Sequence, residues 1–264
     1  MSDDPGELIF GGDLDWLFWP ARRPRPDSAW LGHIPFGHWV VGATQPRILV
    51  ELGTHAGASF ASFCEGVQRR KLKTRCYAVD TWKGDAHSGP YDERVYTDLA
   101  KFTADAYGDF ATLLRMRFAD ALKQFADGSV DLLHIDGLHT YDAVRGNFES
   151  WLPKLSSRAV VLFHDIAERH PGFGVWKFWE ELRQHYPGFG FTHSSGLGVL
   201  CVGPDCPAPV RALAETTDPR SIALIQSRFA ALGENPRMTA TAAKLYREGQ
   251  ALKQALGQAM ARAG

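Results

Sequence analysis

Residues 50–60, VELGTHAGASF, place two glycines and a preceding acidic residue directly after an apolar run. The overlapping stretch 47–52, RILVEL, is almost continuously apolar, which is typical of a strand buried on both faces of a parallel sheet. Gly53 and Gly57 follow in a short turn, and glycine allows the backbone to approach a bound ligand closely. The stretch therefore predicts a buried strand that ends in a ligand-binding turn.

Short apolar runs alternate with longer amphipathic stretches from residue 47 onward. The apolar runs predict strands at 47–52, 75–80, 112–117, 131–136 and 159–165. The stretches between them carry Phe, Val, Trp and Leu at helical spacing. This alternation indicates a doubly wound α/β sheet. Two later runs, 189–193 and 198–203, predict a terminal β-hairpin on that sheet.

Two flanks differ from this predicted domain, which we place at residues 47–206. Residues 1–46 are rich in Pro and Trp, so we expect an aromatic cover segment that packs over the domain. Residues 207–264 predict a C-terminal helical extension, with the last helix from about Pro236 to Ala263. That extension would serve self-association or abut a further domain, and both alternatives stay open.

Composition disfavours several classes of protein. Lys+Arg total 29 against 30 Asp+Glu in 264 residues, a balance that disfavours nucleic acid or an anionic membrane as a partner. The four cysteines have no disulfide-framework spacing, which favours free buried thiols and a reducing compartment. The N-terminus is acidic, unlike a signal peptide, and no apolar run reaches bilayer length. We therefore expect a cytoplasmic protein without a membrane span.

The glycine turn discriminates between cofactors. The dinucleotide fingerprint requires a middle glycine for the pyrophosphate, and His55 stands there, which disfavours an NAD-linked oxidoreductase. The pattern Glu51-x-Gly53-x-x-x-Gly57 resembles the first motif of class I S-adenosylmethionine-dependent methyltransferases. That resemblance implies a Rossmann-like sheet and a turn around the methionine part of the cofactor. The residues that it assigns to this part are Glu51, Gly53, Thr54, Gly57 and Ser59.

Acidic residues also follow the second and third strands. Asp80 ends the second strand, where a carboxylate accepts hydrogen bonds from both ribose hydroxyls; Thr81 lies beside it. The alternative role for Asp80 is a turn or helix cap. Residues 118–120, with Asp120 at their end, fall where the same family recognises adenine.

Several segments in order carry a closer resemblance. They are WLGHIPFGHWVV (30–41), ILVELGTHAGASF (48–60), AVDTWKGDAHSGPYDE (78–93), LLHIDGLHTYDAVRGNFESWLPKL (132–155) and VVLFHDI (160–166). Together they resemble the type 24 methyltransferase family, over roughly residues 28–203. Members of that family often occur beside or fused to bacterial glycosyltransferases. The resemblance implies O-methylation of a sugar, glycan or glycosylated metabolite in polysaccharide biosynthesis, with a glycosyltransferase as partner. The C-terminal helices would bind that partner or form a homo-oligomer.

The ends of the fourth and fifth strands carry the candidate chemistry. Asp136-x-x-His139, followed one strand later by His164 and Asp165, is similar to metal-dependent sugar O-methyltransferases of macrolide biosynthesis. The similarity implies that Asp136 and Asp165 bind magnesium and that His139 is the general base. His164 stands where those enzymes have a carboxylate; as a third ligand it leaves room for manganese, zinc or no metal, because magnesium prefers oxygen ligands. For His134, inside the strand, we predict a structural role.

The segment after Asp80 is polar and aromatic. Its members Trp82, Asp85, His87 and Tyr91 either line an acceptor site or form a loop with Trp82 packed inward. Two further functions remain open beside a sugar O-methyltransferase. One is O-methylation of a non-sugar natural product, and the other is a non-catalytic cofactor-binding scaffold of glycan assembly.

Overall fold

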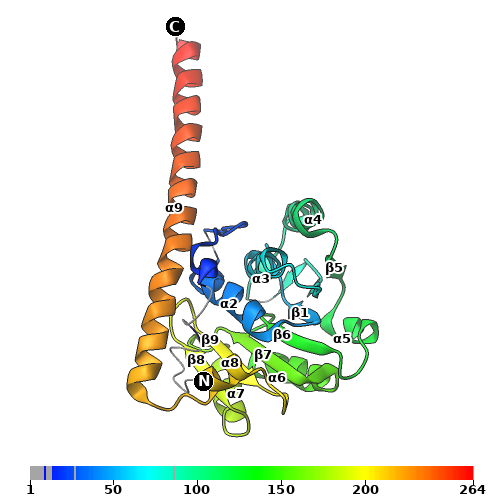
Figure 1. The fold of residues 1–264 in the computed structure, drawn as a ribbon. Coiled ribbons are helices and arrows are strands. Elements are labelled where there is room, and N and C mark those ends of the chain that lie inside the picture. Colours follow the sequence, from blue (N-terminus) through cyan, green and yellow to red (C-terminus); the bar gives the residue numbers. More distant parts are fainter. Residues whose placement is uncertain (1–8, 10–13, 27, 86, 264) are drawn as a thin grey trace.

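The computed structural model describes residue 9 and residues 14–26, 28–85 and 87–263. Its centre is a seven-stranded sheet in the order β5-β2-β1-β6-β7-β9-β8 (Figure 1). The strands are β1 (Ile48–Leu52), β2 (Arg75–Asp80), β5 (Ala111–Arg115), β6 (Val130–Ile135), β7 (Leu155–His164), β8 (Gly188–Phe191) and β9 (Leu197–Cys201). The predicted strands and terminal hairpin are confirmed, as is the doubly wound α/β architecture.

Five strands are parallel, and β9 and β8 join them antiparallel. Strand order reverses between β1 and β6, so the chain leaves β1 toward one edge of the sheet and later returns to the other side of β1. In register, Leu52 of β1 lies beside Val79 of β2 and Ile135 of β6. The carboxyl ends of these strands therefore meet at one place, which is where open α/β sheets bind ligands.

The sheet has a hydrophobic core on each face because side chains alternate along a strand. Leu49 belongs to the core that holds Phe60 and Phe63 of α3, and Val50 belongs to the core that holds Phe148 of α6 and Phe178 of α7. Glu51, between apolar neighbours, faces the same side as Leu49. The larger helices are α2 (Ile34–Thr44), α3 (Ala58–Arg69), α4 (Glu93–Tyr107), α6 (Tyr141–Trp151), α7 (Val175–Leu182) and α8 (Ala208–Ala214). Short elements near the site are β3 (Gly84–Asp85), β4 (Gly89–Pro90) and α5 (Phe118–Ala121), and the 3-10 turns are η1 (Asp15–Phe18), η2 (Ala29–His33), η3 (Leu122–Gln124) and η4 (Leu152–Lys154).

The last helix is longer than the sequence suggested. We expected it to begin near Pro236, but α9 runs from Pro219 to Ala263 with Pro236 inside it. Proline lacks an N–H and crowds the preceding turn, which made it look like a helix start. Packing overrides that preference: Ile225 and Phe229, both upstream of Pro236, are about 1% exposed. Tertiary burial of these side chains holds the earlier turns helical.

The cysteine prediction is half wrong. Cys64 and Cys76 are free and buried, as expected. Cys201 and Cys206, expected to be free, form a disulfide. Their separation of five residues spans a turn after β9, in which the Cys206 N–H donates to the Gly203 carbonyl at 3.1 Å. This turn brings the two Cα atoms to 5.7 Å, the spacing that a disulfide requires.

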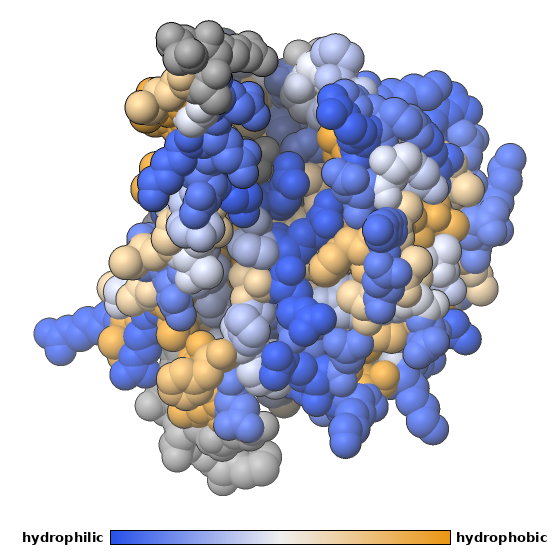
Figure 2. All heavy atoms as spheres, turned by 90° about the horizontal axis from the view of Figure 1, so that it is seen from above, coloured by the Kyte–Doolittle hydropathy of each residue, from blue (hydrophilic) through white to orange (hydrophobic). Residues whose placement is uncertain are grey.

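Residues 1–8, whose acidity was weighed against a signal peptide, lie outside the described part of the chain. Within that described part, every helix is too short or too polar to cross a bilayer. Seen from above, the coloured surface is mostly hydrophilic, with hydrophobic residues in small separate patches (Figure 2). That face therefore presents no broad apolar area among the residues drawn in colour.

Candidate functional site

The glycine turn after β1 lies against the end of β6. The Gly53 N–H donates to the Val79 carbonyl at 3.0 Å, which holds the turn on β2. Gly53 has φ +89°, and a Cβ there would clash with the Asp136 carbonyl oxygen. Gly57 begins α3 with φ +79°, and a Cβ there would collide with Leu99. Both glycines are thus required by backbone conformation and by space.

Asp80 organises this turn from the neighbouring strand. Its Oδ2 accepts hydrogen bonds from the Thr54 and His55 N–H groups, both at 3.0 Å, and its Oδ1 accepts from the Trp82 N–H at 2.8 Å. The turn-cap role is therefore present. A carboxylate offers about four lone-pair sites, so one remains for a ligand hydroxyl.

Glu51 is buried beneath the turn and lines neither pocket described below. Trp30 Nε1 donates to His134 Nε2 at 3.1 Å, which leaves the proton of His134 on Nδ1; that Nδ1 lies 2.9 Å from Glu51 Oε1 and donates to it. His134 is fully buried, in agreement with the structural role predicted for it. The second Glu51 oxygen, Oε2, has no protein partner.

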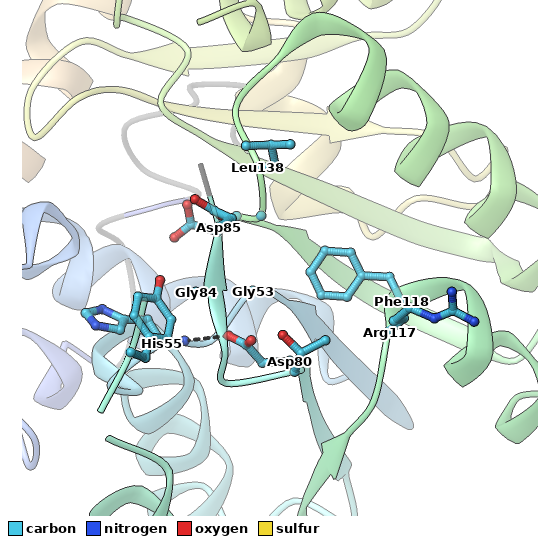
Figure 3. A pocket seen from close by; sticks show the side chains of 12 residues that line it. Gly53, His55, Asp80, Gly84, Asp85, Arg117, Phe118 and Leu138 are labelled. Carbon is cyan, nitrogen blue, oxygen red and sulfur yellow. Dashed lines mark hydrogen bonds between the residues drawn. The ribbon is translucent and has the colours of Figure 1, made fainter. Parts of the chain in front are cut away.

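A first pocket of about 240 Å³ opens beside the turn (Figure 3). Phe118 points into it from α5, whereas Arg117 points away and pairs with Asp120 at 2.7 Å. Asp120 is therefore not brought to the pocket. The residues that line the first pocket are Gly53, His55, Asp80, Thr81, Gly84, Asp85, Tyr91, Arg117, Phe118, Asp136, Gly137 and Leu138.

A second pocket of about 230 Å³ adjoins the first. Four lining residues are common to both, namely Gly53, His55, Tyr91 and Asp136, so the two form one continuous cleft. The second pocket also includes Thr54, Gly57 and Ser59 of the turn, Arg25, Ser28 and Trp30 of the N-terminal segment, and His139, His164 and Asp165.

Three side chains at the far end of this cleft form a compact polar cluster. Asp136, His139 and Asp165 each offer a ligand atom, and these atoms lie within 4.8 Å of one another. His139 Nε2 is 2.9 Å from Asp165 Oδ2 and 3.8 Å from Asp136 Oδ1. Asp165 has φ +64°, an uncommon backbone conformation for a residue other than glycine and one that concentrates at functional sites.

His164 also contacts this cluster and lines the second pocket. Its Nε2 donates to the Ser194 carbonyl at 3.2 Å, and its Nδ1 is 3.2 Å from Asp136 Oδ1 and 3.3 Å from Asp165 Oδ1. His139 is the histidine whose ring nitrogen lies within ligand distance together with both carboxylates. His164 contacts the same two carboxylates, so its predicted role as a metal ligand stays a prediction.

The cluster is electrostatically coupled. Burial alone would lower the pKa of His139, but hydrogen bonds and charges from Asp136 and Asp165 outweigh burial and raise that pKa to about 10. The same two carboxylates raise the pKa of His164 to about 9 against the effect of burial. Burial alone would raise the pKa of Asp136, but mainly His164 and then His139 hold it well below its usual range. Without a cation, the positive charges of the protonated histidines balance the negative charges of Asp136 and Asp165. A divalent cation bound there would displace a histidine proton, because metal ligands bind in their deprotonated form.

An aromatic stack covers the outer side of His139. Its ring stacks on Phe173 with centroids 4.8 Å apart, and Phe173 stacks on His87 at 4.9 Å. The two histidine Nδ1 atoms are 3.4 Å apart. His87 thus contacts the cluster from outside.

The other residues predicted in the segment after Asp80 lie in different places. Trp82 is 1% exposed, with its Nε1 donating to the His55 carbonyl at 2.8 Å, so it packs inward. Asp85 and Tyr91 line the first pocket. Four further residues near the site could not be identified from the sequence, because nothing in their spacing relates them to the glycine turn: Arg25, Trp30, Leu138 and Phe173.

Residues 50–166 match the sequence family Methyltransf_24, described as a methyltransferase domain. This part of the chain is a methyltransferase domain. The predicted family is thereby confirmed at the level of the domain, and the match favours it over an NAD-linked oxidoreductase.

The methyltransferase domain also has relatives of known sequence or structure. The uncharacterized protein y4gI of Sinorhizobium fredii is 45% identical over 227 residues, which cover 84% of this chain and 25% of that protein. The chain thus spans about a quarter of the length of this curated relative.

Two solved structures share the fold at lower identity. One is the O-methyltransferase TomG of Streptomyces achromogenes, which is involved in tomaymycin synthesis and was solved in complex with SAM. It is 18% identical to this chain with a TM-score of 0.51, and the match covers 75% of this chain and 93% of TomG. The SAH-bound methyltransferase PaMTH1 of Podospora anserina is 16% identical, with a TM-score of 0.50 and 76% and 88% covered. These likenesses agree with the Rossmann-like fold.

Proposed function

We propose that this chain is an S-adenosylmethionine-dependent O-methyltransferase that acts on a hydroxyl of a sugar, glycan or glycosylated metabolite. The observation that carries the proposal is the continuous cleft that joins the glycine turn to Asp136, His139 and Asp165. The sugar class rests on the type 24 resemblance. A non-sugar natural product is the alternative acceptor.

The cofactor fits the glycine turn and the residues beneath it. The turn is bare at Gly53, where a Cβ would clash with the opposite backbone. The buried Glu51 Oε2 and Thr54 Oγ1 have no protein partner, so both have unused hydrogen-bonding capacity near the turn. An acidic environment suits a ligand that carries an ammonium and a sulfonium.

We assign the parts of the cofactor as follows. Gly53, Thr54, Gly57 and Ser59 would surround its methionine end, above Glu51. Asp80 and Thr81 would face the ribose, and Phe118 would lie against the adenine. Asp120 would act at one remove, through its ion pair with Arg117, which lines the first pocket. The N-terminal segment 1–46, through Trp30 and Arg25, would cover the domain at 47–206.

S-adenosylmethionine supplies an electrophilic methyl carbon, so the chain's own task is to align an acceptor oxygen and to receive its proton. Alignment alone can contribute several kcal/mol. His139 lines the cleft with its Nε2 beside both carboxylates and is the candidate base; as an imidazolium it must first lose its proton. A divalent cation held by Asp136 and Asp165 would favour neutral His139 and would stabilise an alkoxide. Magnesium or manganese suits this oxygen-rich set.

The same Nε2 atom cannot be both a metal ligand and the base. We expect His139→Ala to keep Mn²⁺ binding within about tenfold while turnover falls by about 10²–10⁴. Asp165→Asn should weaken both Mn²⁺ binding and turnover. If His139→Ala abolishes Mn²⁺ binding measured by calorimetry, His139 is a metal ligand. If the His139→Ala variant retains full turnover, His139 is not the base.

The proposal as a whole is tested by binding and by product. Calorimetry should show affinity for S-adenosylhomocysteine and none for NAD; the reverse result rejects it. Radiolabelled methyl should transfer to a sugar-containing fraction of the source cell. Cofactor binding without transfer to any fraction would support the scaffold alternative, with a glycosyltransferase as the partner of the C-terminal helices.

A cytoplasmic location is also part of the proposal. The free thiols Cys64 and Cys76 support this location, because a reducing compartment keeps thiols free. The Cys201–Cys206 disulfide argues against it.

A further inference from the structure

The second half of α9 stands clear of the α/β domain (Figure 1). Ala240, 1% exposed, is the last buried residue of the helix whose side chain is described. Large apolar side chains nevertheless continue beyond it: Leu245, Tyr246, Leu252, Leu256 and Met260 are 61–72% exposed. Such a row is costly in water unless another surface covers it.

The row follows a seven-residue period. Leu224, Met238, Leu245 and Leu252 are exposed apolar residues whose numbers differ by multiples of seven. Taken as heptad position d, they place Ala242, Gly249 and Leu256 at position a. A straight α-helix drifts relative to a strict heptad, so this period keeps one seam together only when two helices supercoil.

The seam faces away from the domain. Gly233 and Ala240, also seven apart, are buried, and a Cβ on Gly233 would clash with the Gly32 backbone. Both occupy heptad position f, which lies opposite positions a and d on a helix of 3.6 residues per turn. The domain therefore packs on one face of α9 and leaves the a/d face open.

We propose that α9 forms a parallel two-stranded coiled coil with α9 of a second copy of this chain. Charge selects this partner and direction. Glu248 occupies position g, and Lys253 occupies position e of the next heptad; a parallel pair brings these two together across the seam on both sides. An antiparallel pair would set position g against g and e against e. Glu248 is 59% exposed, and its contact with Lys244 of the same helix spans 4.0 Å, so it is accessible to a partner.

Small residues support the same packing. Ala242 and Gly249 at position a allow the two helix axes to approach closely, since interaxial distance depends on the side chains at the contact. Tyr246 and Met260 at position e widen the apolar seam. The dimer would hold its two methyltransferase domains at the same end of the coiled coil.

The first test is the mass of the full chain in solution. Light scattering should give twice 29.2 kDa for the unmodified chain and 29.2 kDa for Leu245→Glu/Leu252→Glu. The matched control, Gln250→Glu/Gln254→Glu, adds the same charges on the outer face and should remain dimeric. A monomeric unmodified chain, a higher oligomer, or a dimer that survives Leu245→Glu/Leu252→Glu overturns the proposal. Unchanged domain unfolding in both variants excludes misfolding as the cause.

The second test is direction. Single cysteines introduced by Leu245→Cys and by Leu252→Cys should each cross-link the dimer on oxidation, because equivalent d positions face each other in a parallel pair. The free native thiols Cys64 and Cys76 are buried and should not interfere. An antiparallel dimer would cross-link at one of these positions at most, and that result overturns the parallel arrangement.

Discussion

Gly53 sets how closely the turn after β1 can approach the end of β6. Its positive φ and the nearby Asp136 carbonyl leave no space for a side chain. A substitution there has to move the turn that we assign to the cofactor.

We expect Gly53→Ala to weaken S-adenosylhomocysteine binding at least about tenfold, or 1.4 kcal/mol. It should also lower the free energy of unfolding by about 1–2 kcal/mol, because alanine tolerates this conformation poorly. Calorimetry and chemical denaturation measure the two effects. Gly146→Ala in α6 is the matched control, since a Cβ there meets nothing within 4 Å. Unchanged affinity in Gly53→Ala would place the cofactor elsewhere.

His87 contacts His139 directly from outside the cluster, with ring centroids 5.6 Å apart, and both rings stack on Phe173. We expect His87→Ala to reduce turnover by about 10–100-fold, as removal of an outer partner of a site histidine does. Its unfolding midpoint should not change because His87 is exposed. His170→Ala, another exposed histidine near Phe173, should leave turnover unchanged. Equal losses in both variants would contradict a specific role for His87.

Among the elements, the amino-terminal ends of β1, β6 and β7 are joined by hydrogen bonds to one buried carboxylate, that of Asp131. Asp131 of β6 accepts from the Arg47 N–H at 2.7 Å and from its side chain at 2.9 Å, and from the Ser156 hydroxyl at 2.6 Å. Burial alone would raise the pKa of Asp131, but these donors lower it below the usual value. The ionised form is therefore the one that stabilises the fold.

We expect Asp131→Asn to lower the free energy of unfolding by about 1–3 kcal/mol at neutral pH. A depressed pKa in the folded state contributes stability above the unfolded pKa near 4, and this stability is lost as pH falls through the folded value. The difference between the two proteins should therefore shrink in acid. Denaturation at pH 7 and below pH 4 measures it. Asp127→Asn, whose side chain is 75% exposed, is the control and should cost less than about 1 kcal/mol. A difference that grows in acid would contradict this account.

At the scale of the whole molecule, α9 has two halves with different roles. Phe229 is 1% exposed and contacts Trp16, Phe36 and Phe191 at centroid distances of 5.9, 5.5 and 5.3 Å. The first half therefore belongs to the hydrophobic core, whereas the second half projects from the domain.

We expect Phe229→Ala to destabilise the domain by about 3–5 kcal/mol, because it removes a buried aromatic ring from a packed cluster. Truncation after Thr241 should leave the unfolding of the domain and its affinity for S-adenosylhomocysteine unchanged. Denaturation and calorimetry on both variants provide the comparison. A truncated chain that unfolds like Phe229→Ala would show that the projecting half supports the domain.

The sequence by itself determined the sheet, its order of elements and the glycine turn. The strands are short apolar runs whose period is local, and Gly53 and Gly57 are required by local backbone conformation. Asp136, His139 and Asp165 could also be named, since residues at the carboxyl ends of adjacent parallel strands must lie close together.

Only the tertiary structure decided which of these side chains share a cluster. His139 and His164 both lie beside Asp136 and Asp165 because the turns after β6 and β7 set the directions of these side chains, and the alternation along a strand does not extend into turns. Trp30, Phe173 and the start of α9 at Pro219 depend on contacts between residues far apart in the chain. Such contacts override local preference, and no local pattern records them.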